Sequence, residues 1–168
     1  MRFKVLGAAA CGAFTAALVF VALGTAASAK PVMPAAVTTL HLVEIDHSFN
    51  FVDNPPKLDP KTQEFSPGDS FVFSSELRTS SGKHAGWLDA TCSAVTGGKN
   101  AATECTGAFR LTGGELVASA TVAGDHKVTN ISIVGGTGAY AGVRGQVRSV
   151  SIGGADSNRS NDTITFWK

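Results

Sequence analysis

The feature that most constrains this chain is a repeated alternation of apolar and polar residues, interrupted at short intervals by glycine and asparagine. A period of two places successive side chains on opposite faces of a strand, and beyond residue 36 no stretch sustains the 3.6-residue period of a helix. We predict eight strands, at 37–46, 70–78, 87–95, 104–111, 115–122, 127–134, 143–152 and 163–167. The segment 47–67 contains four prolines and several polar residues, which predicts a long loop of functional or mobile character.

The short connections between these strands predict consecutive antiparallel hairpins. Glycine pairs such as Gly97-Gly98 and Gly113-Gly114 lie where hairpin turns are expected. Closing such a sheet on itself removes its two exposed edges. An eight-stranded barrel is just wide enough to be filled by side chains or to hold one small ligand. We therefore predict an all-β fold, an eight-stranded antiparallel up-and-down barrel over 37–168. A two-sheet sandwich is the alternative, because local patterns do not distinguish the two.

The N-terminal segment has the pattern of a secretory signal. Arg2 and Lys4 precede an apolar run from Val5 to Leu23, and Ala27-Ser28-Ala29 forms a small-x-small cleavage site. We predict that 1–29 is a cleaved signal peptide, that 30–36 is a flexible leader, and that the protein is secreted to an extracellular or periplasmic space. The apolar run is nearly long enough to cross a bilayer, so a retained membrane anchor is the alternative. After cleavage we expect no stable membrane association.

Charge and cysteine content narrow the function classes. Without Arg2 and Lys4, 12 of the 14 basic side chains remain against 13 acidic ones. This balance provides no basic field for nucleic acid. Beyond the signal segment the chain keeps Cys92 and Cys105, and an even pair in an oxidising compartment predicts a disulfide; two unpaired thiols are the alternative. Their spacing is not a zinc pattern and no His-x3-5-His accompanies it, so we expect no metal.

Three segments of the chain resemble a known family. They are Gly68–Phe73 (GDSFVF), the glycine-rich block Gly135–Gly145 (GGTGAYAGVRG) and a threonine-rich last strand. Together they resemble the allene oxide cyclase/dirigent superfamily, and most closely its secreted bacterial members, from about Val37 to the C-terminus. The resemblance implies an eight-stranded antiparallel barrel with an apolar central cavity, often assembled as a trimer, that needs no cofactor.

The first predicted strand carries the strongest candidate for chemistry. Alternation puts Leu42, Glu44 and Asp46 on one face and His41, Val43 and Ile45 on the other. If the first face is inward, two carboxyl groups lie at the mouth of an apolar cavity, where burial raises a carboxyl pKa. Periodicity alone does not decide which of the two faces points inward.

The superfamily resemblance favours the face with Glu44. Plant allene oxide cyclases carry a Glu-x-Asn pair that lines the cavity, and Glu44-Ile45-Asp46 matches its first position and departs at the second. A loop proline holds the catalytic water in those enzymes, and Pro55 or Pro56 corresponds to it. The resemblance thus implies Glu44, Pro55 and Pro56 as catalytic positions.

Further ligand contacts follow from the same comparison. Ser75 corresponds to a cavity asparagine, Asn130 to a tyrosine and Cys92 to a cavity cysteine. Phe71, Phe73 and Leu77 share one strand face with Ser75 and predict an apolar wall. The predicted ligand-binding set is Leu42, Asp46, Phe71, Phe73, Ser75, Leu77 and Asn130.

Two functions of different classes agree with these residues, and both have a small hydrophobic molecule as partner. In the first, the protein is a cofactor-free cyclase or isomerase that holds a reactive intermediate in a folded conformer, while Glu44 stabilises the charge that develops on ring closure. In the second, it is a non-enzymatic dirigent-like or lipocalin-like protein that orients or carries a hydrophobic compound. The sequence leaves open whether the protein is an enzyme.

Overall fold

The computed structural model describes residues 36–58, 61–62, 64–124, 127–153 and 158–168. The predicted signal peptide 1–29 lies outside the described residues, as does the predicted leader except for residue 36. Within the described ranges, no helix has the length and apolar character needed to cross a membrane.

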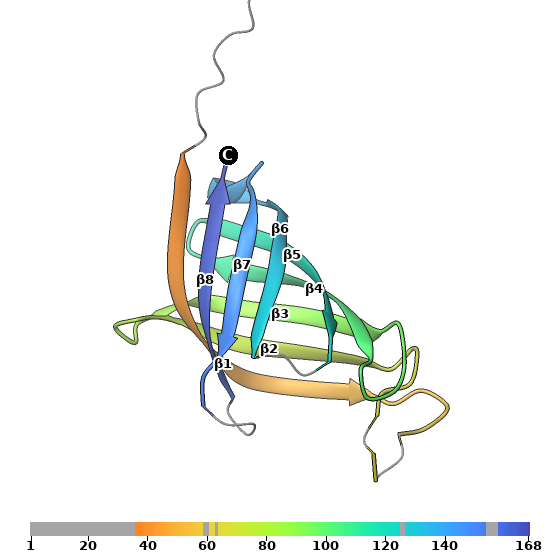
Figure 1. The fold of residues 1–168 in the computed structure, drawn as a ribbon. Helices are drawn as coiled ribbons and strands as arrows, with labels where there is room; N and C mark the ends of the chain where they lie inside the picture. The colour runs from red at the N-terminus through yellow and green to blue at the C-terminus, as the bar shows by residue number, and fades with distance from the viewer. Residues whose placement is uncertain (1–35, 59–60, 63, 125–126, 154–157) are drawn as a thin grey trace, which may run out of the picture. The chain divides into compact units, whose positions relative to one another are not determined.

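The described residues form a closed antiparallel barrel, as predicted (Figure 1). Each strand pairs with the next in the chain, and the first pairs with the last, which leaves the sheet without a free end. The elements are β1 Val37–Val52, β2 Ser70–Thr79, β3 His84–Ala94, β4 Ala102–Leu111, β5 Gly114–Ala123, β6 Val128–Gly136, the short 3-10 helix η1 Gly138–Tyr140, β7 Arg144–Ser151 and β8 Arg159–Trp167.

Two strands extend furthest beyond the ranges that the sequence pattern predicts. β1 continues to Val52, so the prediction of a loop from residue 47 was wrong for its first six residues. β8 begins at Arg159 rather than at residue 163. Neither extension continues the alternation of apolar and polar residues. Both segments still form strand, because a neighbouring strand supplies their hydrogen-bond partners.

A β-bulge at His47 explains why the local pattern of β1 misleads. The register changes from Asp46 opposite Ser75 to Ser48 opposite Ser74, so His47 is an extra residue. Beyond the bulge, Phe49 lies opposite Phe73, and cross-strand partners share one face of the sheet. The aromatic residues of this second half of β1 therefore face the same side as the carboxyl groups of the first half.

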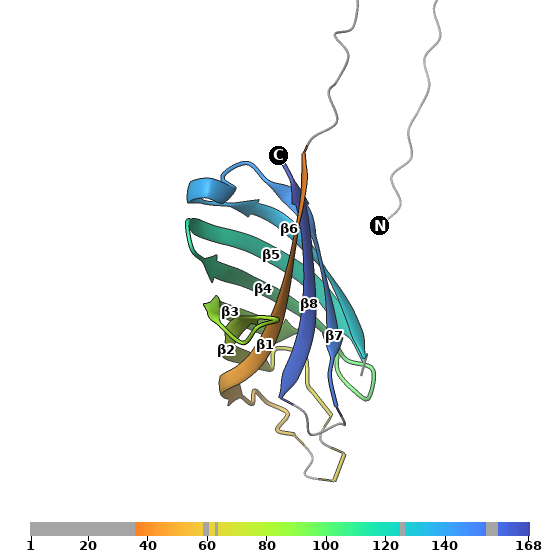
Figure 2. The ribbon, with the colours of Figure 1, turned by 90° about the vertical axis from the view of Figure 1, so that its left-hand side faces the viewer.

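The glycine-rich block packs over one end of the core. η1 lies at this end of the barrel (Figure 2), and the Tyr140 ring meets Phe166 edge-on at 5.7 Å between centroids. The hydroxyl of Tyr140 donates to the carbonyl oxygen of Thr112 at 3.3 Å. Gly138 has a φ of +57°, and a Cβ there would lie 2.2 Å from the carbonyl oxygen of Gly113. The turn therefore requires glycine at this position.

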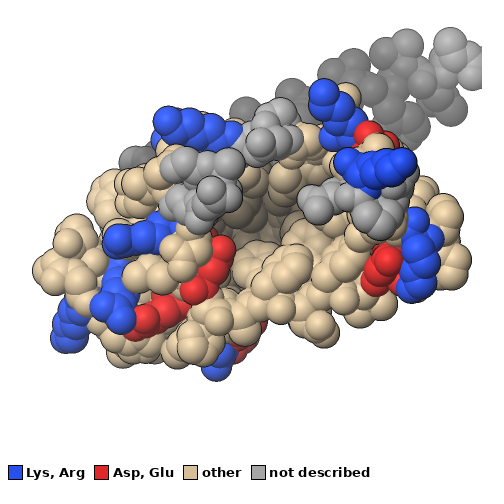
Figure 3. All heavy atoms as spheres, turned by 90° about the horizontal axis from the view of Figure 1, so that it is seen from below, with Lys and Arg blue, Asp and Glu red and all other residues tan. Residues whose placement is uncertain are grey.

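The opposite end of the barrel is open. Seen from that end, the molecule is hollowed, and charged side chains lie around the rim (Figure 3). The packed core, which includes Leu42, Leu77, Leu116 and Ile164, fills the interior on the η1 side. The fold thus leaves one compartment that a small molecule can enter.

Candidate functional site

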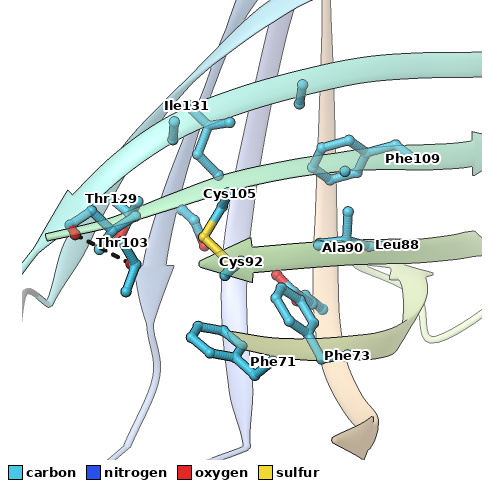
Figure 4. Close-up of a pocket in the computed structure, with 16 residues that line it drawn as sticks. Phe71, Phe73, Leu88, Ala90, Cys92, Thr103, Cys105, Phe109, Thr129 and Ile131 are labelled. Atoms are coloured by element: carbon cyan, nitrogen blue, oxygen red, sulfur yellow. Dashed lines mark hydrogen bonds between the residues drawn. A yellow bond between two sulfur atoms is a disulfide. The ribbon is translucent and has the colours of Figure 1, made fainter. Parts of the chain in front are cut away.

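The site is an internal cavity of about 260 Å³, bounded by seven of the eight strands. Its walls are mostly apolar, with Phe71, Phe73, Leu88, Phe109, Ala120 and Ile131 among the side chains that line it (Figure 4). The hydroxyl groups of Thr103, Thr129 and Ser149 add polar positions. Glu44 is the one ionisable side chain among the described residues on the wall. This composition suits one small, mostly apolar ligand with a polar group at a defined place.

A wider hollow connects the cavity with the surface. It measures about 600 Å³ and shares Phe71, Thr103 and Val122 with the inner cavity. Phe65 lies in this outer hollow, and its ring stacks on Phe71 at 6.2 Å between centroids and an interplanar angle of 26°. Because the two spaces share three lining residues, we expect ligands to enter past Phe71.

The environment of Glu44 favours its protonated form. The pKa of Glu44 is raised from 4.5 to about 8, chiefly by burial and also by the nearby carboxyl groups of Asp162 and Asp46. The Ser75 hydroxyl opposes this increase. Near neutral pH Glu44 is therefore mainly a carboxylic acid, which can donate a hydrogen bond or a proton.

Asp162 is a buried neighbour of the site that the sequence interpretation missed. It lies on β8 opposite Leu42 of β1 and Ser149 of β7, and it is only 2% exposed. Both of its carboxyl oxygens lack a hydrogen-bond partner within the described part of the chain. Burial raises the pKa of Asp162, and the nearby Ser149 hydroxyl and Glu44 carboxyl oppose that rise.

A signal for Asp162 was present in the sequence. Asp162, Ile164 and Phe166 alternate along β8, and all three are buried. With the predicted strand starting at residue 163, Asp162 fell outside the pattern, so its inward direction was not recognised.

The structure brings several predicted site residues together. Glu44, Phe71 and Phe73 line the cavity, and Cys92 does so as well. Ser75 and Leu77 are fully buried on the inner face of β2, next to the cavity rather than on its wall. Leu42 is buried in the packed core.

Other predicted residues lie elsewhere. Asp46 is exposed at the edge of the site, where its Oδ1 accepts a hydrogen bond from Ser75 Oγ at 3.2 Å. Pro55 and Pro56 are exposed in the loop after β1 and do not line the cavity. Asn130 is exposed on the outside of β6, because the strand alternation turns Thr129 and Ile131 inward instead.

The predicted disulfide is confirmed. Cys92 on β3 and Cys105 on β4 are direct cross-strand partners, with an S–S distance of 1.99 Å and a Cα–Cα distance of 4.1 Å. The bond forms part of the cavity wall (Figure 4). Among the described residues no group of three or more His, Cys, Asp or Glu side chains is arranged to hold a metal ion.

Replacing both cysteines by alanine in a chain of residues 30–168 should lower the free energy of unfolding by about 3 kcal/mol. The bridge closes a loop with a sequence separation of 13, and its loss frees the unfolded chain. Urea unfolding followed by tryptophan fluorescence measures the change. The unmutated chain should show no reactive thiol in denaturant until a reductant is added, and two reactive thiols before reduction would contradict the bridge.

The chain folds as a closed eight-stranded barrel with one packed end and an apolar cavity at the other, and this fold is similar to that of dirigent proteins and of cyclase barrels. Three solved structures show this likeness. A pyocyanin demethylase superposes with a TM-score of 0.64 at 22% identity, over 76% of this chain and 99% of that one. A pterocarpan synthase dirigent protein gives 0.65 at 17% identity, over 79% and 95%. The Diels–Alderase AbmU from Streptomyces koyangensis gives 0.61 at 14% identity, over 80% and 69%.

These likenesses concern the fold, because all three identities are low. No protein-family model matches the chain, and no curated protein is significantly similar to it in sequence. The chemistry of the site must therefore be argued from its own residues.

Proposed function

We propose that the barrel binds one small, mostly apolar molecule and acts on it as a cofactor-free cyclase or isomerase. The observation that carries this proposal is a buried, protonated carboxyl group, Glu44, on the wall of an otherwise apolar cavity. Structural neighbours of the same fold include a Diels–Alderase and a pyocyanin demethylase, which supports a role in small-molecule chemistry.

The proposed catalysis has two parts. The apolar walls hold a flexible ligand in a folded conformer and exclude water, so that part of the entropy of ring closure is lost on binding. The carboxylic acid of Glu44 then donates a hydrogen bond or a proton to negative charge that develops in the ligand, and this interaction is little screened beside an apolar space. Pro55 and Pro56 have no part in this proposal, because both are exposed away from the cavity.

A non-enzymatic role is the second candidate. A dirigent protein is among the structural neighbours, and most of the cavity wall consists of side chains with no reactive group. Such a barrel could orient or carry a hydrophobic compound while the chemistry takes place elsewhere.

The variant Glu44→Gln separates the two roles. It keeps the size of the side chain and removes its proton chemistry, so turnover should fall on the order of a hundredfold while binding of an apolar probe changes little. Fluorescence titration with neutral N-phenyl-1-naphthylamine measures binding. Mass spectrometry of a panel of linear polyenes and allylic epoxides, with and without protein, measures isomerisation.

Asp46→Asn is the matched control, because Asp46 lies on the same strand but is exposed. Equal isomerisation by wild type and Glu44→Gln would favour the non-enzymatic role. If the wild-type protein does not bind the neutral probe at all, the proposal of a ligand-binding barrel is overturned.

We also propose that the protein works outside the cytoplasm. A disulfide is typical of oxidising compartments, and the structure contains one. N-terminal sequencing of the exported protein should then begin at Lys30, whereas a retained Met1 would favour the membrane anchor.

We also predict that the protein forms a trimer. Sedimentation of the purified chain tests this prediction.

A further inference from the structure

The buried carboxyl group of Asp162 lies beside Glu44 and Ser149 but forms no direct hydrogen bond within the described residues. Its two oxygens are buried and accept no hydrogen bond from the described residues. A buried acceptor without a donor is costly, and such groups in folded proteins usually meet water or a ligand. Glu44 lies diagonally across from it on the inner face, since Leu42 is opposite Asp162 and Glu44 is opposite Ser160.

The surroundings of this carboxyl pair supply hydroxyl groups but no positive charge. Asp46 on β1 is the third acidic group near Glu44, Ser75 faces it from β2, and Ser149 approaches Asp162 from β7. No Lys, Arg or His side chain is found among the described residues that line the cavity.

The charge of the pair follows from its two ionisations. Near neutral pH Glu44 retains its proton, because its pKa is about 8 and the negative charge of Asp162 opposes its ionisation. The pair then carries one proton and one negative charge, which no described residue of the cavity wall neutralises.

We propose that the Glu44–Asp162 pair is a binding site for a positively charged amine, so that the ligand class is a small apolar molecule carrying one basic nitrogen. An alkylammonium group has three donors and no acceptor. Glu44 and Ser149 line the cavity, and Asp162 lies beside both of them on the inner face of β8. A single positive charge on the ligand balances the single negative charge of the pair.

The rest of the ligand would lie against the apolar wall. Phe71, Phe73 and Phe109 contribute aromatic rings to the cavity wall (Figure 4). A neutral alcohol of the same shape would gain this apolar contact but leave the charge of the pair unbalanced. A carboxylate would be repelled.

This inference rests on the proposed ligand-binding function. Three probes of similar shape and different charge distinguish a failure of the amine site from a failure of the ligand-binding function. Calorimetric titration at neutral pH compares 1-naphthylmethylamine, 1-naphthylmethanol and 1-naphthoate. We expect the amine to bind at least tenfold more tightly than the alcohol, and the carboxylate to bind most weakly. In Asp162→Asn the preference for the amine should fall to less than threefold, while the affinity for the alcohol is retained. Glu44→Gln replaces a neutral acid by a neutral amide and leaves the charge of Asp162, so it should keep a preference for the amine.

Asp46→Asn is the control for long-range charge, because it removes one nearby acid outside the cavity and should leave the preference intact. Equal binding of amine and alcohol by the wild-type protein would overturn the amine site and leave the apolar cavity standing as a binding site. Absence of binding for all three probes, together with the neutral dye, would instead overturn the proposed function itself. If Asp162→Asn unfolds, as judged by circular dichroism, titration of the wild-type protein at acidic pH decides the question, because the preference for the amine should be lost once both carboxyl groups are protonated.

Discussion

Raising the pH from about 5 to about 8 should destabilise the folded wild-type protein by about 3 kcal/mol, and Glu44→Gln should remove most of this loss. The folded protein holds a proton on Glu44 up to a pKa of about 8, whereas the unfolded chain releases it near 4.5. Between these values the native state binds more protons, so stability is fully present below the lower pKa and is lost as the pH rises through the higher one.

The same reasoning gives the sign and size of the variant's effect. Near pH 8 the glutamine variant should be more stable than wild type by about 4 kcal/mol. The reason is that glutamate is ionised in the unfolded wild-type chain and is held back from ionising in the apolar cavity, whereas glutamine does not ionise in either state. Below about pH 4.5 the two should be equally stable. Urea unfolding at a series of pH values measures the difference.

The exposed neighbour Asp46 provides the comparison for this experiment. Asp46→Asn should leave most of the pH dependence in place, since its carboxyl group is already at the surface. A pH profile that is the same in wild type and Glu44→Gln would show that Glu44 is not a buried acid, and the proposed chemistry would then lose its central group.

Filling the cavity should abolish ligand binding. Ala120 on β5 lines the cavity with a single methyl group, and Ala120→Phe would place a ring in a space of about 260 Å³. We expect the affinity for neutral N-phenyl-1-naphthylamine to fall by more than a thousandfold, on the order of 4 kcal/mol, because the ring occupies the volume that the probe needs.

Ser119→Phe adds the same ring to the same strand on the outer face, where Ser119 is exposed. This variant should bind the probe like wild type, which separates loss of the cavity from a general effect on β5. Circular dichroism and a thermal melt show whether each variant folds. Unchanged binding by a folded Ala120→Phe variant would mean that the probe binds outside the barrel.

The strand pattern was sufficient for an all-β fold of consecutive hairpins, but it did not decide between a barrel and a sandwich or fix every boundary. Six short connections with glycine turns allow little besides consecutive hairpins, and barrel closure is the arrangement that removes both edges. The end of β1 and the start of β8 could not be predicted, since their strand conformation depends on hydrogen bonds from partners distant in sequence.

The candidate site was predictable only in part. Alternation correctly grouped Glu44 with Leu42, and the family resemblance indicated the inward face, where Glu44 indeed lines the cavity. The same resemblance suggested Asn130, which the register of β6 turns outward. Alignment with a family identifies which residue occupies a given position. The direction of that side chain depends on the local strand register, which the alignment does not contain.

The sequence by itself determined the class of fold, the number of strands, and the cysteine pair, because these depend on periodicity, turn residues and composition. Only the tertiary structure decided that the bulge at His47 turns Phe49 toward the inner face, and that Asp162 lies beside Glu44. The physical reason is that a barrel joins its first and last strands. The pair on β1 and β8 is separated by most of the chain, and its shared proton arises from burial and proximity that no local pattern contains.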